Sequence, residues 1–139
     1  MSDSPIQQLL DAIDSREVDA VMELVSPEAS VLTADGRRAH GAQSVRKLLG
    51  DFLAGLRSTG HQIIAEWHVG EDLWIAEVQA SYELRDWLQL TAVPRAFFLR
   101  WSADGIAELR VYGAHEHPLD DHPTGEEGLW VGGRWIPPL

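Results

Sequence analysis

Cysteine is absent from the 139 residues, which excludes disulfides, thiolate nucleophiles and cysteine-based metal sites. Lysine is nearly absent as well, because Lys47 is the single lysine among eleven basic residues and the rest are arginines. Lys47 falls between Val45 and Leu48 on what reads as the outer side of a helix, a poor position for Schiff-base chemistry. The chain also lacks any apolar run of roughly 18 residues, so no membrane-spanning segment is expected.

Basic residues are few compared with acidic ones, 11 against 22, which gives a net charge of −11. Nucleic acid requires a basic face, so a nucleic-acid partner is not expected. The acidic N-terminal segment, residues 1–15, passes directly into an amphipathic pattern and does not resemble a signal peptide. We therefore expect a cytoplasmic protein with no nucleic-acid or membrane partner.

The length and composition that remain fit one folded domain. A chain of 139 residues with 45% hydrophobic residues can bury a core, but it is too short for two comfortable domains. Six tryptophans are many for this length. Large aromatic surfaces usually belong to cores, pockets and interfaces.

The first part of the chain carries three amphipathic helical patterns. Ser4 can cap the first helix, Pro5 suits its first position and Gln7 completes a capping box. A short second helix ends at Pro27, and a third helix opens at Gly41. The apolar stripes are Ile6, Leu9, Leu10 and Ile13 in the first, Val18, Val21, Met22 and Val25 in the second, and Val45, Leu48, Leu49, Phe52 and Leu56 in the third.

Strand patterns dominate the rest of the chain. A small hairpin, residues 29–33 and 37–40, turns at Asp35-Gly36, and period-two patterns then predict strands at 62–69, 73–84, 88–101 and 106–115. The drier side of residues 73–84 should face the helices: Trp74, Ala76, Val78, Ala80, Tyr82 and Leu84. The expected class is α+β, with three N-terminal helices packed on a strongly curved mixed or antiparallel sheet.

Four phrases in this order carry a family resemblance: LLDAIDSREVDAVMELV, ASVLTADGRRAHGAQSV, WIAEV and SADGIAELRVYGAHEHPL. The chain resembles the SnoaL-like group of the nuclear-transport-factor-two-like superfamily from about Ile6 to Leu119. The resemblance implies a cone-shaped domain over residues 1–119, a pocket between the helices and the concave sheet face, and commonly a dimer. It implies no single activity, because the superfamily includes isomerases, cyclases, epoxide hydrolases, dehydratases and non-catalytic binding domains.

The catalytic residues of two related groups have no equivalent at the matching positions. Members similar to ketosteroid isomerase use a tyrosine and two aspartates, which match Leu9, Leu32 or Thr33, and Ala96. Members similar to limonene epoxide hydrolase use an arginine and two aspartates, which match Val78, Ala80 and Val111. Both catalytic sets are therefore expected to be missing.

The expected pocket is mostly apolar. Its predicted ligand-binding residues are Leu9, Leu10, Phe52, Trp67, Trp74, Val78, Tyr82 and Val111. Tyr82 is the best catalytic candidate, because its hydroxyl could donate a hydrogen bond to a ligand carbonyl, although a core tyrosine bonded to backbone explains it too. His40 and Asp35, beside the first hairpin, are weaker candidates, and Asp35 before a glycine suits a turn role.

A polar cluster near the end of the chain is the alternative site. His115 and His117 would lie on one face of a strand, and His122 with Asp120 and Asp121 could complete a metal site. Pro118 interrupts the segment, and a solvated acidic connector explains the same residues. We therefore expect no metal and no cofactor.

The outer face of the sheet is the expected partner surface. Taking Ala96 as facing the pocket places Phe97, Leu99 and Trp101 on the outer face, together with Tyr112. An exposed apolar patch of this kind indicates a homodimer through the outer sheet face.

Residues 120–139 form an extension beyond the resemblance. Leu129–Val131 and Arg134–Ile136 flank Gly132-Gly133, the spacing of a tight hairpin with Trp130 opposite Trp135. An isolated hairpin is marginally stable. We expect this one to pack on the outer sheet face or across the dimer rather than over the pocket.

The preferred function is the binding of a hydrophobic small molecule, a polyketide, terpenoid or steroid-like metabolite, with isomerisation, cyclisation or dehydration as the reaction. The alternative is a non-catalytic ligand-binding or protein-interaction domain of the same fold, which the missing catalytic residues favour.

Overall fold

The computed structural model describes residues 4–113, 129–131 and 134–136. Helix α1 (Pro5–Asp14) begins where the sequence predicts, because the Ser4 hydroxyl accepts a hydrogen bond from the Gln7 backbone N–H at 3.1 Å. Two further helices follow in the described part of the chain, α2 (Val18–Met22) and α3 (Ala42–Ala54).

One open mixed sheet forms the other layer, with the described strands in the order β2-β1-β6-β5-β4-β3. Strands β1 and β6 run parallel, and every other neighbouring pair is antiparallel. The strands are β1 (Val25–Leu32), β2 (Arg38–His40), β3 (Leu56–Val69), β4 (Leu73–Leu84), β5 (Gln89–Ser102) and β6 (Gly105–Gly113). The molecule is therefore α+β.

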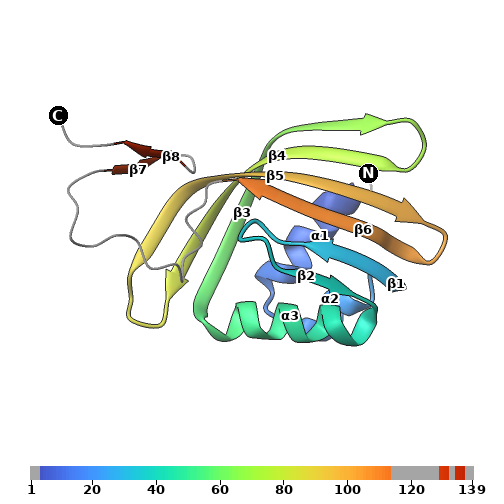
Figure 1. Cartoon of the computed structure of the whole chain (residues 1–139), viewed down its shortest axis with the longest axis horizontal. Helices are drawn as coiled ribbons and strands as arrows, with labels where there is room; N and C mark the ends of the chain where they lie inside the picture. Colours follow the sequence, from blue (N-terminus) through green and yellow to red (C-terminus); the bar gives the residue numbers. More distant parts are fainter. Residues whose placement is uncertain (1–3, 114–128, 132–133, 137–139) are drawn as a thin grey trace.

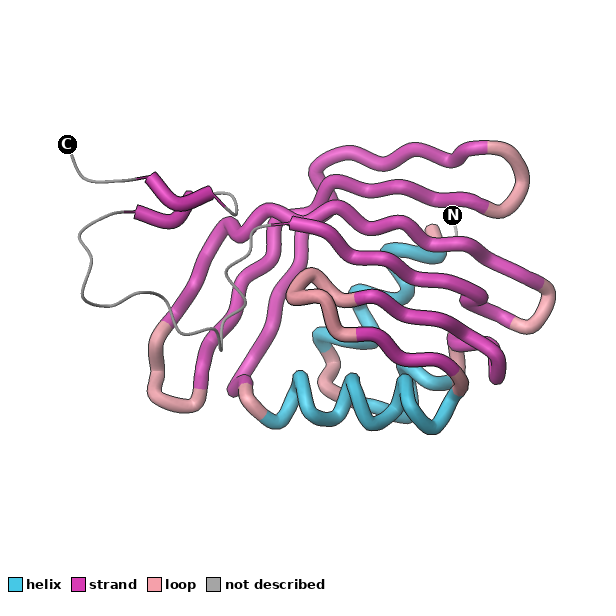
Figure 2. Tube along the Cα trace, viewed as in Figure 1, coloured by secondary structure: helices cyan, strands magenta, loops and turns pink. Residues whose placement is uncertain are grey.

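The long strands bend around the helices, which lie together on the concave side of the sheet (Figure 1). Helix α1 contacts β3, β4 and β5, whereas α3 contacts β1, β2 and β3. Figure 2 shows the same division, with the cyan helices on one side of the magenta sheet. The inner face of the sheet is thus the wall against which the helices pack.

The core lies between these two layers. Ala76, Val78 and Ala80 on β4 are fully buried, as are Ile6 and Leu10 on α1. Each large aliphatic side chain buried in this way stabilises the fold by about 1.5–3 kcal/mol. The prediction that this side of β4 faces the helices is confirmed.

Two strands begin several residues before the positions predicted for them. Val25 belongs to β1 rather than to the second helix, and Pro27 lies inside β1 instead of ending a helix. The pairing of β1 with β6 is interrupted between Val25 and Ser30, so the missing N–H of Pro27 costs no ladder hydrogen bond there. Strand β3 begins at Leu56 instead of residue 62, which places His61 within a long strand.

The predicted orientation of β5 is wrong. Phe97 and Leu99 are buried in the core and Trp101 packs against it, whereas Ala96 pairs with Glu77, an exposed residue, on the opposite face. The physical reason is the register with β4: Ala76 lies opposite Phe97 and Trp74 opposite Leu99, and residues directly opposite each other in an antiparallel pair point to the same face. The match of Ala96 to a position facing the pocket is therefore off by one residue.

Near the C-terminus, β7 (Leu129–Val131) pairs antiparallel with β8 (Arg134–Ile136), and Trp130 is opposite Trp135 in the register. The packing surface expected for this hairpin and the division of the chain at residue 119 stay predictions. No helix in the described part of the chain is both long enough and apolar enough to cross a membrane.

Candidate functional site

A cavity of about 130 Å³ lies between the helices and the concave face of the sheet. Apolar side chains from the helices and from β1, β5 and β6 form most of its wall, among them Leu9, Phe52, Phe97 and Val111. The polar side chains among its described lining residues are Thr33, Arg37, His61, Tyr82 and Arg95. The wall of the cavity is therefore mostly apolar, and these five side chains are the ones that can exchange protons or hydrogen bonds with a ligand.

His61 is held by Asp14, the last residue of α1. The imidazole Nδ1 lies 2.7 Å from the Asp14 carboxylate, and the His61 backbone N–H donates to the other carboxylate oxygen at 3.1 Å. Thr59, two residues earlier on β3, also donates to Asp14, at 2.7 Å. The carboxylate thus fixes the ring from the Nδ1 side, and within the described residues Nδ1 makes the ring's hydrogen bond, so Nε2 is the nitrogen that can meet a ligand.

An aromatic frame surrounds the imidazole, whose side chain is only 4% exposed. The His61 ring meets Tyr82 edge to face, with centroids 6.3 Å apart, and meets Phe97 in the same way at 6.2 Å. Phe52 of α3 packs edge to face on Tyr82 at 6.0 Å. Such contacts restrict the ring orientations, so the imidazole is preorganised for a single position.

Tyr82 lies beside Arg95 on the inner face of β4 and β5. Burial raises the pKa of the Tyr82 hydroxyl above its ordinary value, the charge and hydrogen bond of Arg95 oppose this rise, and the Asp14 charge adds to it. Tyr82 is therefore a neutral hydrogen-bond donor at neutral pH. The Arg95 guanidinium carbon is 6.0 Å from the centre of the Tyr82 ring.

Arg95 occupies its buried place because the neighbouring strand has a glycine there. Arg95 pairs with Gly113 of β6, and a Cβ atom at Gly113 would lie 3.0 Å from the Arg95 side chain. The missing side chain lets the arginine lie across the sheet. Only 4% of Arg95 is exposed.

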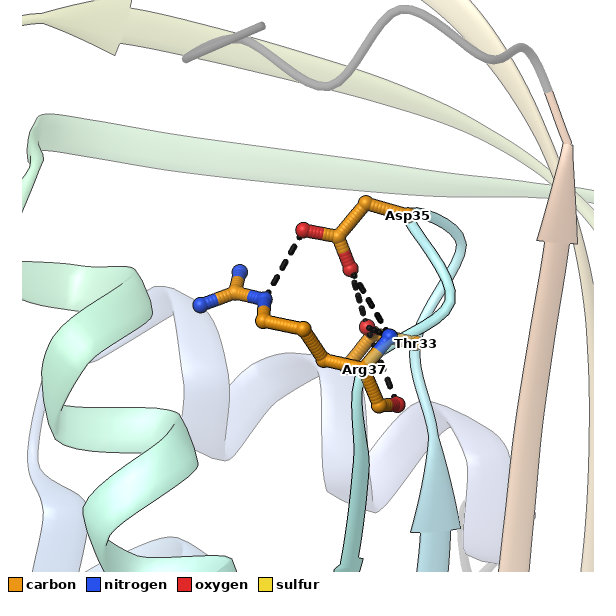
Figure 3. Close-up of polar contacts among 3 residues, drawn as sticks. All are labelled: Thr33, Asp35 and Arg37. Atoms are coloured by element: carbon orange, nitrogen blue, oxygen red, sulfur yellow. Dashed lines mark hydrogen bonds and ion pairs between the residues drawn. The ribbon is translucent and has the colours of Figure 1, made fainter.

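The turn between β1 and β2 supplies the remaining polar groups (Figure 3). The Arg37 Nε donates to Asp35 at 2.8 Å, and the Thr33 hydroxyl donates to the same carboxylate. Figure 3 shows the Arg37 guanidinium extending from the turn toward the side where α3 lies. Asp35 does not line the cavity itself but orients Arg37, which does.

Half of the predicted ligand-binding residues line the cavity. These are Leu9, Phe52, Tyr82 and Val111. Leu10 and Val78 are fully buried in the core instead and do not reach the cavity. Val78 and Val111 both lie on the inner side of the sheet, as the predicted register requires.

Two predicted tryptophans lie away from the cavity. Trp74 stacks on His68 with ring centroids 4.0 Å apart, close to the turn between β3 and β4. Trp67 is 53% exposed and pairs with Ile75. A bulge in β3 between Ile63 and Ala65 moves Trp67 to the outer face.

The two weaker catalytic candidates, Asp35 and His40, differ in their position relative to the cavity. Asp35 reaches the cavity indirectly through Arg37, whereas His40 does not line the cavity and bonds Ser30 at 2.9 Å. The alternative metal cluster, His115, His117 and His122, lies outside the described residues. Within those residues no group of three or more metal-binding side chains is found.

Sequence reasoning missed four residues of the site: Asp14, Arg37, His61 and Arg95. The predicted strand began at residue 62, which left His61 outside it. In the structure Thr59, His61 and Ile63 alternate along the inner face of β3, so a strand predicted to begin earlier would have included His61. Arg95 shares a period-two row with Val93, Phe97 and Leu99, and a charge within a buried row was the available signal. Asp14 gave no signal, because its contact with β3 spans 47 positions.

The arrangement combines a base with hydrogen-bond donors in an apolar enclosure. A neutral His61 whose Nδ1–H is bonded to Asp14 can accept a proton at Nε2. Tyr82 and Arg95 can donate to an oxygen on which negative charge develops. These are the components of proton transfer next to a carbonyl group.

No family model matches the sequence, and no curated protein matches it. The fold, however, is shared with many solved structures. A protein with a ketosteroid isomerase-like fold from Catenulispora acidiphila, in complex with trimethylamine, superposes with a TM-score of 0.72 at 16% identity, over 81% of this chain and 86% of that one.

Two further structures show the same fold. An NTF2-like protein of unknown function from Exiguobacterium has a TM-score of 0.67 at 16% identity, over 78% of this chain and 97% of that one. A SnoaL-like polyketide cyclase candidate from Shewanella denitrificans has a TM-score of 0.69 at 9% identity, over 78% and 86%. The chain therefore has the NTF2-like fold, in agreement with the resemblance. Because the sequence identities are low, the likeness establishes the fold and no shared activity.

Proposed function

We propose that this chain binds a small, mostly apolar organic molecule in its cavity and moves a proton on it, with His61 as the general base. The observation that carries the proposal is the Asp14–His61 contact of 2.7 Å at the wall of an apolar cavity that also presents Tyr82. Burial and a fixed carboxylate partner are how proteins prepare an imidazole for this role.

The proposed step breaks a C–H bond beside a ligand carbonyl. The proton passes to His61 Nε2, and the electron pair moves onto the carbonyl oxygen, to which Tyr82 donates a hydrogen bond. Return of the proton to another carbon gives isomerisation. Loss of a neighbouring hydroxyl as water gives dehydration, and attack of the enolate carbon on a second carbonyl closes a ring.

The cavity size limits the ligand. Its volume of about 130 Å³ approaches that of the roughly 150 Å³ apolar cavity that accommodates a benzene ring. A ligand of about one ring fits better than a steroid or a long polyketide. The trimethylamine complex of the Catenulispora protein supports the binding of small molecules by this fold.

A non-catalytic binding domain is the second candidate. It is favoured by the residues at the matched catalytic positions, since Leu9, Val78 and Ala80 carry no titratable group. The sequence comparison matched Ala96 to a catalytic aspartate that faces the pocket. Ala96 lies on the outer face of the sheet, where an acid would not meet a ligand in the cavity. The two candidates differ in whether His61 changes a rate or only an affinity.

Hydrogen exchange on cyclohexanone in D₂O, followed by proton NMR, separates them. We expect the protein to accelerate exchange at the α-carbon, and His61→Gln to lower this acceleration at least about 100-fold, since general-base catalysis contributes at least that much. His68→Gln is the matched control, because His68 stacks on Trp74 outside the cavity lining. A protein that binds cyclohexanone without accelerating exchange would be a binding domain.

We also propose a homodimer through the outer sheet face. Its support is a group of apolar side chains there: Trp67, Ile75, Phe98 and Tyr112, of which Trp67 and Tyr112 are exposed. A surface patch of this kind is typical of an interface. The cytoplasmic location inferred from the sequence stays a prediction.

A further inference from the structure

Tyr82 shares its wall of the cavity with a buried arginine. Tyr82 of β4 and Arg95 of β5 both line the cavity, and both side chains are buried. Arg95 lies opposite Val78, which is on the inner face of β4 like Tyr82, so the two strands present the guanidinium and the phenol on the same side. The guanidinium carbon is 6.0 Å from the centre of the Tyr82 ring. The phenol that the proposed function uses therefore has a cationic neighbour with little exposure to solvent.

The direction of the hydrogen bond between these two residues follows from their chemistry. A side-chain hydrogen bond joins Arg95 to Tyr82. A guanidinium has N–H donors and no acceptor, so the phenol oxygen must accept in this bond. The phenol proton therefore cannot point at Arg95. It is left to donate to another acceptor.

The charge of Arg95 acts in the same sense as this geometry. Burial and the Asp14 charge raise the pKa of the Tyr82 hydroxyl, whereas the charge and hydrogen bond of Arg95 lower that pKa. The titratable ring of His61 also meets Tyr82, edge to face, with 6.3 Å between centroids. Of the causes acting on the phenol oxygen, Arg95 is thus the one that favours negative charge there. Hydrogen bonds linked in a chain polarise one another, so a bond from a cation makes the phenol a stronger donor.

We propose that Arg95 is a positioning residue that acts through Tyr82: it occupies the phenol oxygen and turns the phenol proton toward the carbonyl oxygen of the bound ligand. Negative charge that develops on that carbonyl is then stabilised by a donor that is itself held by a cation. Gly113 of β6 makes room for this arrangement, because a Cβ atom there would lie 3.0 Å from the Arg95 side chain. The inference rests on the proposed function in taking a carbonyl-bearing ligand in this cavity, but it concerns the Tyr82 donor and not proton removal by His61.

The pairing itself is tested without ligand, because the chain has two tyrosines and Tyr112→Phe leaves Tyr82 as the only one. Fluorotyrosine incorporated into this variant gives a single fluorine NMR signal that follows ionisation of the Tyr82 phenol, at a lower pH than tyrosine itself requires. Arg95→Met in the same background shifts the midpoint of this titration upward, because burial and Asp14 both raise the pKa and the opposing cation is gone. Arg95→Lys keeps a cation with N–H donors and shifts the midpoint less. An unchanged midpoint in Arg95→Met overturns the inference.

The action on the ligand is tested by a double-mutant cycle on cyclohexanone affinity, measured by isothermal titration calorimetry. Arg95→Met weakens binding by about threefold to tenfold in the parent, the range that corresponds to one net hydrogen bond. In the Tyr82→Phe background the same substitution changes affinity less than about twofold, because there is no phenol proton to orient. Equal losses in the two backgrounds overturn the inference, because Arg95 would then act independently of Tyr82.

Arg100→Met is the matched control, because it makes the same change on β5 at a half-exposed arginine that pairs with Asp72 outside the cavity lining. It leaves the fluorine titration and cyclohexanone affinity unchanged. Arg95→Gln is neutral as well and carries the same expectations, which keeps the test decisive if Arg95→Met does not fold. Coupling of Arg95 with Tyr82 in a protein that does not accelerate exchange supports this inference and contradicts the proton-transfer proposal. Exchange that depends on His61 without this coupling does the reverse.

Discussion

At the scale of single residues, the site depends on Asp14 ending α1 over the inner face of β3. Its carboxylate accepts hydrogen bonds from the Thr59 hydroxyl, the His61 backbone and the His61 ring. The same three bonds tie the helix to the sheet and orient the imidazole. Stability and chemistry are therefore coupled at Asp14, and its substitution should affect both.

Asp14→Asn should lower the free energy of unfolding by about 1–3 kcal/mol, because a partly buried acceptor of three hydrogen bonds loses its charge. Urea denaturation measures the change. Asp51→Asn is the control, since Asp51 pairs with Lys47 on the exposed side of α3 and should change stability by less than about 0.5 kcal/mol. Equal effects of the two substitutions would show that Asp14 does not tie α1 to the sheet.

Tyr82 predicts a dependence of stability on alkaline pH. Burial raises the pKa of Tyr82 in the folded state, so the unfolded chain loses this proton first. The contribution is complete below the ordinary tyrosine pKa of about 10 and is lost as the pH rises through the folded-state value. Tyr82→Phe should therefore reduce the fall in unfolding free energy above about pH 10.

Urea unfolding at several alkaline pH values checks this expectation. Tyr112→Phe, which removes the other tyrosine hydroxyl from the outer face, should retain the fall shown by the parent. If Tyr82→Phe and the parent decline identically, the alkaline loss of stability arises elsewhere.

At the scale of elements, the sequence predicts most of the architecture because the signals are local. Ser4 and Pro5 mark the start of α1, and the alternation along β4 identifies its buried side. The orientation of β5 could not be read in this way, because apolar residues occupy both of its faces, and Ala96 was placed toward the pocket by the family resemblance rather than by alternation. Arg95 was missed for the same reason.

The site as a whole was less predictable than the fold. Tyr82, Phe52 and Leu9 follow from periodicity, because each belongs to the buried side of its own element, whereas Val111 follows from the family resemblance. The Asp14–His61 contact spans 47 positions and depends on where a helix end meets the sheet, and local patterns carry no such information. A long-range contact of this kind requires the three-dimensional register.

Gly113 tests the link between strand packing and the site. Gly113→Ala places a methyl group against the Arg95 side chain and the Pro94 carbonyl, and should cost about 1–3 kcal/mol of stability. Gly60→Ala on β3 is the matched control, because nothing lies within 4 Å of its Cβ position, and it should be neutral or slightly stabilising. Thermal and urea unfolding of both variants measure the difference. A Gly113→Ala protein as stable as Gly60→Ala would mean that the β5 backbone at Pro94 and the Arg95 side chain can both move away from the added methyl group.

At the scale of the whole molecule, the two faces of the sheet have separate tasks. The inner face holds the core and the cavity, so apolar side chains there are accounted for by the fold. Among the described residues no helix covers the outer face, yet this face carries Ile75, Phe98 and Tyr112 near one another, and Phe98 meets Tyr112 edge to face at 5.7 Å. Apolar surface that is not needed for the core is best explained by association.

The last prediction follows from this outer face. Phe98→Glu should convert a dimer into a monomer, because a carboxylate placed among apolar side chains at the centre of an interface must be desolvated, and Arg110, whose guanidinium lies 5.8 Å from the centre of the Phe98 ring, offsets only part of that cost. Sedimentation velocity at micromolar concentration measures the state of the parent and the variant. Gln79→Glu adds the same charge at an exposed position of β4, away from this apolar group, and should leave the dimer intact. The inner face is untouched by either substitution, so ligand binding in the cavity should persist in the monomer. A parent protein that sediments as a monomer would contradict the proposed interface, and a dimer that survives Phe98→Glu would place the interface on another surface.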